Sequence, residues 1–160
     1  MSTRANELAD QFQAANADVL AFVTACDGTT WNTSCAGEEW TIGTVAAHIA
    51  DSYAAVTGWI RDIAAGRPVP VTPDDLEEGN TTRATANAGR ARDNVLAALR
   101  ERGATAADVV RSFSDEDLAY SASFGLRGDE AVSAEWLIRY VLISHPRQHL
   151  ASMRASAKNA

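Results

Sequence analysis

The sequence of 160 residues has only two cysteines and three histidines. Cys26 and Cys35 are too few for a disulfide framework; a bridge across their short loop is sterically conceivable, but we expect free thiols in a reducing compartment. No apolar stretch reaches the ~18 residues that a transmembrane helix needs. The polar N-terminal stretch MSTRANELADQFQ lacks the apolar core of a signal peptide. These absences predict a cytoplasmic protein with no membrane partner.

Positive charge is also scarce. Lysine and arginine together number 14 against 21 aspartates and glutamates, so the net charge is −7. A nucleic-acid binder needs clustered cations to neutralise phosphates, and we therefore expect no nucleic-acid partner. P-loop, dinucleotide-binding and Ser-His-Asp motifs are absent too, which excludes three common enzyme types.

Helical periodicity, by contrast, is strong. Apolar side chains recur on one helix face in four segments, and neither strand alternation nor an internal repeat is found. The segments are 3–26, 41–65, 81–113 and Ser133–Met153. The expected N-caps are Thr3, Thr41 and Ser133. The length fits one domain, 1–160, and we predict an all-α four-helix bundle.

The connections between these segments carry further predictions. Residues 28–40 and 120–131 have the composition of loops, and 66–80 contains three of the four prolines. We interpret 66–80 as a long surface crossing, after which the next helix can run antiparallel or parallel to the previous one. Within 81–113, the alanine-rich start of the apolar face either lets helices approach closely or leaves room for a ligand. Gly103 is a candidate kink.

All three histidines lie on apolar helical stretches. His145 and His149 are four residues apart, and residues at this spacing share one helix face. His48 lies far upstream, in the run TVAAHIADSY. A lone histidine on an apolar face is more often a hydrogen-bonded core residue, but three buried imidazoles need three sets of partners, which one metal ion supplies at once. We therefore predict that His48, His145 and His149 bind a divalent metal that keeps open positions.

The segment HPRQH has no glutamate between its histidines, so it is not the HExxH pattern of metalloproteases. Pro146 removes a helical N–H and predicts a kink between the two histidines. Either this kink aims His145 at the metal, or the helix breaks there and the two rings no longer share a face.

Three further residues are candidates for contact with a substrate. Trp40 precedes the second helical segment and either contacts substrate or only pins the connector onto the bundle. Asn87 lies one residue off the alanine-rich face and is a candidate polar contact. Arg147 lies between the paired histidines, at a pocket rim or in solvent.

Taken together, these segments resemble the DinB/YfiT-like superfamily of metalloenzymes. GEEWTIGTVAAHIADS is similar to the start of its second helix, where a tryptophan, here Trp40, precedes a histidine ligand, here His48. VLISHPRQHLASMRA is similar to its last helix, whose ligands are four residues apart. TANAGRARDNVLAAL followed by SFSDEDL is similar to its third helix.

The resemblance implies an up-down-down-up bundle, a homodimer, and nickel or zinc bound at the positions of His48, His145 and His149. It also implies a thiol-dependent transfer or isomerisation, as in the mycothiol-dependent maleylpyruvate isomerases, or a hydrolysis. Those isomerases carry a glutamate at the position of His145. We therefore expect a metal-dependent transferase or hydrolase that acts on a small-molecule electrophile, with mycothiol or bacillithiol as a possible cosubstrate. The alternative is a bundle that only binds a metal or a small molecule.

Overall fold

The computed structural model describes residues 2–159; residues 1 and 160, the ends of the predicted domain, lie outside the described residues. Four long helical segments form the bundle. They are α1 (Thr3–Ala25), α3 (Ile42–Ala64), α5 (Arg92–Arg111) and a C-terminal segment made of α7 (Ala134–Leu137), η2 (Ile138–Ile143) and α8 (Ser144–Ala157). None of the helices in the described part of the chain is long and apolar enough to cross a membrane.

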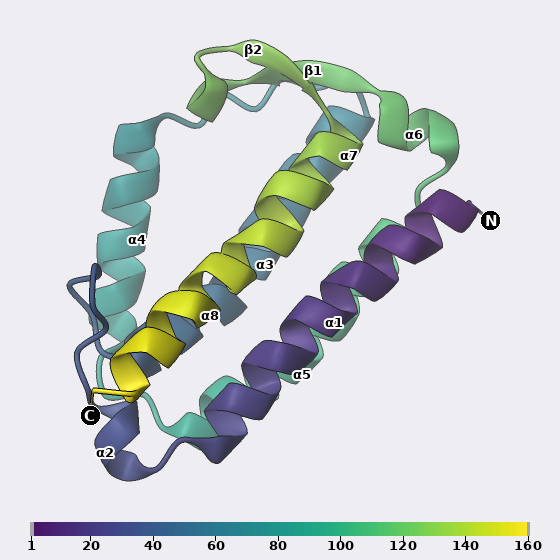
Figure 1. The fold of residues 1–160 in the computed structure, drawn as a ribbon. Helices are drawn as coiled ribbons and strands as arrows, with labels where there is room; N and C mark the ends of the chain where they lie inside the picture. The colour runs from purple at the N-terminus through teal and green to yellow at the C-terminus, as the bar shows by residue number, and fades with distance from the viewer. Residues whose placement is uncertain (1, 160) are drawn as a thin grey trace.

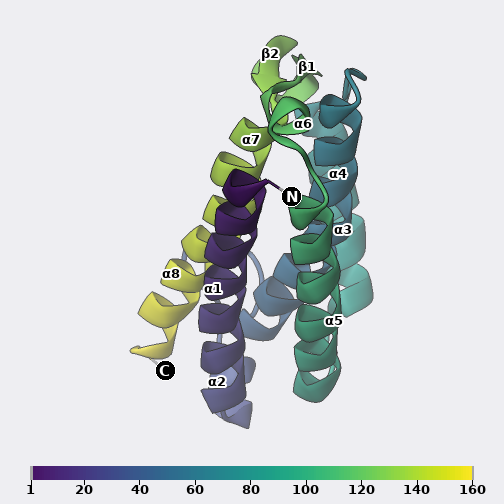
Figure 2. The same cartoon turned by 90° about the vertical axis from the view of Figure 1, so that its right-hand side faces the viewer.

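The order of the helices is the predicted up-down-down-up. Figure 1 shows α1 and the C-terminal segment running in one direction and α3 and α5 running in the other. Figure 1 separates two layers, α1 with α5 and α3 with the C-terminal segment, and in Figure 2 the α1–α5 layer lies in front of the other. The parallel run of α3 and α5 is possible because α4 (Pro73–Asn87) carries the chain back along the outer side of the second layer.

The predicted apolar faces form the core. The α1 face is fully buried at Leu8, Phe12, Ala15, Val19 and Val23. Full burial of each large apolar side chain contributes about 1.5–3 kcal/mol, so these stripes account for much of the packing between layers.

The predicted N-caps are confirmed at two of the three helices. Thr41 caps α3 and Ser133 caps α7, each accepting a hydrogen bond from a backbone N–H three residues on. The prediction for α1 is wrong by one residue, because Ser2 rather than Thr3 accepts from the N–H of Ala5 at 2.9 Å.

The prediction of a surface crossing over all of 66–80 is wrong, because α4 occupies its second half. Thr72 and Asp75 form a reciprocal capping box, and Pro73 takes the first helical position, where its missing N–H costs nothing. Only Ala84 and Asn87 of α4 are buried, so the helix has no apolar stripe that periodicity could detect.

The predicted single helix over 81–113 is also wrong, because α4 ends at Asn87 and α5 begins at Arg92. Gly89, at φ +74°, supplies the left-handed turn between them. The alanine-rich face is consequently not one face. α5 continues through Gly103 as an unbroken α-helix.

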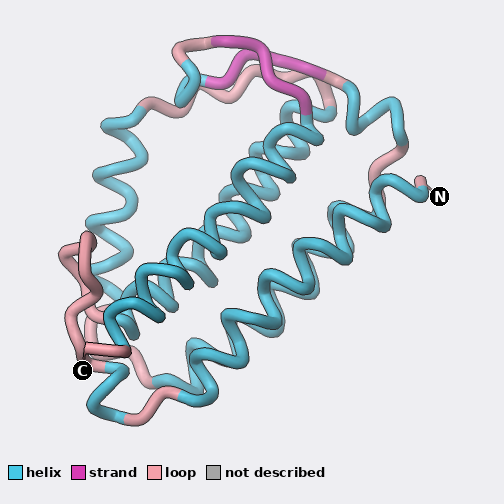
Figure 3. Tube along the Cα trace, viewed as in Figure 1, coloured by secondary structure: helices cyan, strands magenta, loops and turns pink. Residues whose placement is uncertain are grey.

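The prediction of a loop over 120–131 is wrong as well. β1 (Ser121–Phe124) and β2 (Glu130–Ser133) form an antiparallel hairpin, in register from Ser121 opposite Ser133 to Phe124 opposite Glu130. Figure 3 shows it across one end of the bundle. The strands are too short to show a clear alternation. The remaining short elements are α2 (Gly28–Trp31), α6 (Asp115–Ala119) and η1 (Gly125–Arg127).

The hairpin also fixes the chain that leads into α4. Val69 donates its N–H to Ser123 at 3.0 Å and accepts from Gly125 at 2.8 Å. A Cβ at Gly125 would lie 2.3 Å from the carbonyl oxygen of Val71, so only glycine permits this close approach. The contact holds Val71 and Leu126 beside the histidine-bearing helices.

Candidate metal centre

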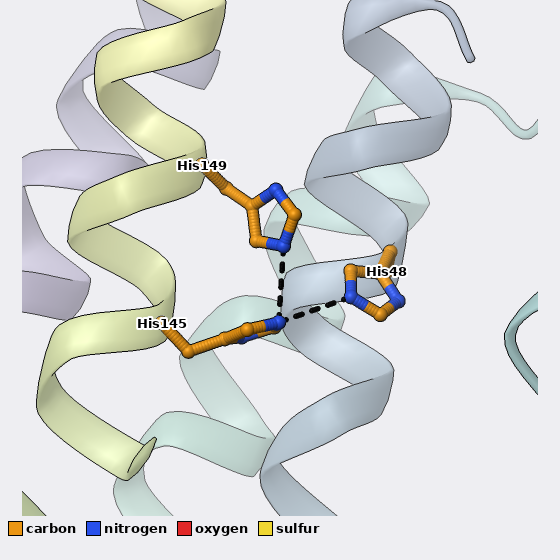
Figure 4. A group of neighbouring side chains, drawn as sticks. All are labelled: His48, His145 and His149. Atoms are coloured by element: carbon orange, nitrogen blue, oxygen red, sulfur yellow. Dashed lines mark hydrogen bonds between the residues drawn. The ribbon is translucent and has the colours of Figure 1, made fainter. Parts of the chain in front are cut away.

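The three histidines converge. His48 lies in the first half of α3, and His145 and His149 lie on α8, with their rings turned toward one another (Figure 4). The Nε2 atom of His145 is 3.1 Å from Nε2 of His48 and 3.0 Å from Nε2 of His149. The ligand atoms of all three lie within 4.8 Å of one another.

A π-helical segment places the α8 pair. The six residues of η2, Ile138–Ile143, form wider turns, and the chain returns to α-helix at Ser144. Pro146 therefore falls in the first turn of α8, where the change of helix type accommodates its missing N–H. The expected kink between the histidines is wrong: the irregularity precedes His145, and the two rings stay one turn apart on one face.

Neighbouring side chains decide which ring nitrogens carry protons. Glu38, in the connector before α3, lies 2.6 Å from Nδ1 of His149. A carboxylate only accepts, so Nδ1 of His149 carries the proton and its Nε2 presents a lone pair. Ser52 Oγ donates to the Ile49 carbonyl at 2.7 Å, and at a longer 3.5 Å it accepts from Nδ1 of His145. Nε2 of His145 then also presents a lone pair.

Burial keeps two of the rings neutral. Desolvation, followed by the neighbouring His149, lowers the pKa of His48 to about 4. Desolvation also lowers the pKa of His145 to about 3, with His149 and His48 as the further causes. Near pH 7 both rings are therefore uncharged, which is the state that binds metal.

The donor set fits a divalent cation. Two lone pairs that face each other at 3.0 Å repel, and a shared cation removes that repulsion. The nitrogens of one tetrahedral zinc site, each at ~2.0–2.1 Å from the ion, lie roughly 3.3 Å apart, close to the two short distances here. Three imidazoles suit zinc or nickel better than magnesium or calcium, which prefer oxygen.

Two cavities meet at this cluster. The outer one, of about 780 Å³, is lined by His149, by residues of the connector that include Trp40, and by polar and apolar residues of α4. The inner one, of about 240 Å³, is lined by His48 and His145 and by mostly apolar side chains. Leu76, Asn80 and Leu126 line both, so they form the boundary between the two spaces.

Comparison with known proteins now identifies the family. The sequence profile of the DinB superfamily matches residues 11–153. The chain belongs to the DinB superfamily. No curated protein sequence matches the chain.

Solved structures of DinB-like proteins share the fold at low identity. YfiT from Bacillus subtilis, "a probable metal-dependent hydrolase with an unusual four-helix bundle topology", has a TM-score of 0.78 and 15% identity, covering 99% of this chain and 89% of its own. The sibling lethal factor precursor DfsB has a TM-score of 0.76 and 19% identity, covering 99% and 98%.

A mycothiol-dependent maleylpyruvate isomerase has a TM-score of 0.73 and 15% identity, covering 93% of this chain. The match spans only 60% of the isomerase. At these identities the comparisons establish the DinB fold, which agrees with the bundle described above.

The three candidates for substrate contact lie in different surroundings. Trp40 lines the outer cavity, and its ring centroid is 5.2 Å from that of His48. Asn87 is buried and donates to Asp51 at 2.6 Å, which ties the end of α4 to α3. It lines neither cavity at the histidines. Arg147 is exposed and lines neither cavity.

Sequence reasoning missed two residues of this DinB site. Glu38 is one of two adjacent glutamates in the connector, and no spacing rule singles it out as the partner of His149. Arg83, on the wall of the inner cavity, lies on α4, which has no apolar periodicity. The capping box of α4 at Thr72 and Asp75 was the available signal, because it predicts a helix that brings later residues back to the site.

Proposed function

We propose that the chain is a metal-dependent enzyme that acts on a small electrophile. It either transfers a low-molecular-weight thiol to this electrophile or hydrolyses it with water. The observation that carries this proposal is the convergence of three imidazole nitrogens at the point where two cavities meet. Structural zinc sites use four protein ligands, whereas three ligands beside open space are typical of catalytic sites.

His48, His145 and His149 would hold the metal. A bound divalent ion supplies Lewis acidity and lowers the pKa of a thiol or water at an open position. The chain's own residues prepare the site: Glu38 orients the ring of His149, and the apolar wall of the inner cavity limits access of water.

The two cavities suit two reactants of different character. The outer cavity lies in the size range of ligand sites and carries three glutamates, Glu38, Glu39 and Glu77, on its wall. This acidic lining disfavours an anionic cosubstrate and suits a polar thiol without carboxylates, of the mycothiol type. The smaller inner cavity suits the electrophile.

The relatives support a metal-dependent reaction and a thiol of the mycothiol type. One is named for a mycothiol-dependent isomerase and another as a probable metal-dependent hydrolase. The chain spans only 60% of the isomerase, so we do not assign the isomerase activity to it. We propose a thiol transfer or a hydrolysis instead. A cytoplasmic homodimer remains a prediction.

The test is turnover by protein loaded with zinc or nickel. Mycothiol and, separately, water are offered as nucleophiles to a panel of small electrophiles and esters. We expect turnover that falls at least ~100-fold in His48→Ala, because removing a ligand weakens both metal binding and activation.

Circular dichroism verifies that the variant keeps its helices. Equal turnover by the two proteins would contradict the proposal. Stoichiometric metal uptake without any product would instead support the alternative, a bundle that only binds.

A further inference from the structure

Arg83 is unusual among the arginines of this chain. Most are paired with carboxylates: Arg4, Arg67, Arg90, Arg92, Arg102, Arg111, Arg127 and Arg139. Within the described residues, the other five have no carboxylate oxygen within 4.0 Å, and four of these are exposed: Arg61, Arg100, Arg147 and Arg154. Arg83 alone combines partial burial with the lack of a carboxylate partner, and it lines the inner cavity.

The guanidinium of Arg83 is held against its own helix. Nη2 donates to Asn80 Oδ1 at 2.8 Å, one turn earlier in α4. A Cβ at Gly79 would lie 3.3 Å from Nη1, so the bare backbone of this glycine makes room for the guanidinium. Glycine inside a helix costs about 1 kcal/mol relative to alanine. The guanidinium is thus placed on the cavity wall with most of its five N–H donors free for a ligand.

Asp75 is the one carboxylate among the described residues that line this cavity, and it is already hydrogen-bonded elsewhere. Asp75 Oδ2 accepts from the backbone N–H of Thr72 at 3.0 Å and from its hydroxyl at 2.7 Å. It precedes Arg83 by eight residues, roughly 12 Å along a helix. Asp75 therefore does not neutralise Arg83, and the Arg83 end of the cavity is cationic.

Apart from Ser52, Asn80 and the two histidines, the rest of the inner cavity is apolar. Its apolar wall residues are Ala55, Val56, Trp59, Val71, Leu76, Leu126 and Val141. Its volume of about 240 Å³ equals that of about eight water molecules at ~30 Å³ each, so it accepts a ligand on the order of ten non-hydrogen atoms. His48 and His145 face the same space.

We propose that the inner cavity binds a small monocarboxylate with an apolar body. Arg83 pairs with the carboxylate through its planar fork, the apolar wall encloses the body, and the remaining end of the ligand faces the histidine cluster. The proposal deepens the proposed function by naming the substrate class and rests on it for the reaction. Binding of the carboxylate by Arg83 needs no metal, so the two proposals fail separately.

The test is calorimetric titration of the full chain with benzoate and with benzamide, which has nearly the same shape but no charge. The buffer contains neither carboxylate nor phosphate, and the salt concentration is held constant. We expect saturable benzoate binding that weakens at least ~10-fold in Arg83→Gln, because a charge-assisted pair is lost, while benzamide binding does not change. Arg83→Lys keeps the charge but not the fork, and we expect an intermediate loss.

Arg100→Gln is the matched control, an exposed arginine on α5 that should leave benzoate binding unchanged. Benzoate binding that is equal in wild type and Arg83→Gln, equal affinities for benzoate and benzamide, or no saturation below ~10 mM would overturn the proposal. Zinc uptake, measured in parallel, tests the other proposal. Arg83-dependent benzoate binding without zinc uptake would leave the carboxylate site standing and remove the metal centre.

Discussion

Glu38 is the residue through which the connector acts on the histidine cluster. It fixes the ring of His149 by a 2.6 Å contact at Nδ1. Loss of such a partner typically costs 10–100-fold in metal affinity. We expect Glu38→Ala to lower zinc affinity by about that factor, measured by competition with a chromophoric chelator. Glu39→Ala, at the exposed neighbour, is the control. Equal effects of the two substitutions would show that Glu38 has no specific role.

His48 and His145 predict a pH dependence of stability in the metal-free protein. Their pKa values are lowered from 6.5 to about 4 and about 3, whereas the unfolded chain takes up these protons near pH 6.5. Between the folded pKa values and pH 6.5, the unfolded state binds more protons than the folded state. The free energy of unfolding that these histidines contribute above pH 6.5 is therefore lost as the pH falls from 6.5 toward about 4 and about 3.

We expect chelator-treated protein to lose about 2 kcal/mol of unfolding free energy per histidine between pH 7 and pH 5, measured by urea denaturation. His48→Gln should be correspondingly less sensitive over the same range. A flat profile in the wild type would contradict the buried, neutral state of these rings.

Two glycines in helix interiors test the packing of the long helices. A Cβ at Gly103 of α5 would lie 2.2 Å from Nδ2 of Asn16, which is held by the carbonyl of Leu99 and the hydroxyl of Tyr53. Asn16 cannot move without losing both bonds, so we expect Gly103→Ala to destabilise by about 1–3 kcal/mol. Gly58 of α3 has no heavy atom within 4 Å of a built Cβ.

Gly58→Ala should therefore stabilise, by up to about 1 kcal/mol, through helix propensity alone. Denaturant midpoints of the two variants should lie on opposite sides of the wild type. A shift of both in the same direction would mean that the layers do not pack as described.

The helices and strands differ in how well the sequence predicts them. The faces of α1 and α3 were predictable because one side of each helix is buried along its whole length. α4 was not, because only Ala84 and Asn87 of this helix are buried and its apolar residues form no stripe. The β1–β2 hairpin was missed because its short strands bury only Phe124 and Val132.

At the scale of the whole molecule, the four long periodic segments predict the bundle, and three histidines on apolar stretches predict that it has a shared site. The cavities were not predictable, because their walls combine residues of the connector, α4 and the hairpin that share no sequence spacing. Their positions depend on tertiary contacts such as the Val69–Ser123 hydrogen bond. The residues that surround the histidines are therefore visible only in the folded structure.

The central claim is that α3 and α8 together supply three imidazoles to one cation. X-ray absorption spectroscopy on zinc-loaded protein without a histidine tag tests it most directly. We expect one zinc per chain with three histidine nitrogens at ~2.0–2.1 Å, and two in the His48→Ala variant. Fewer than three zinc-bound histidine nitrogens in the wild type would contradict the claim, and so would an unchanged spectrum in the His48→Ala variant.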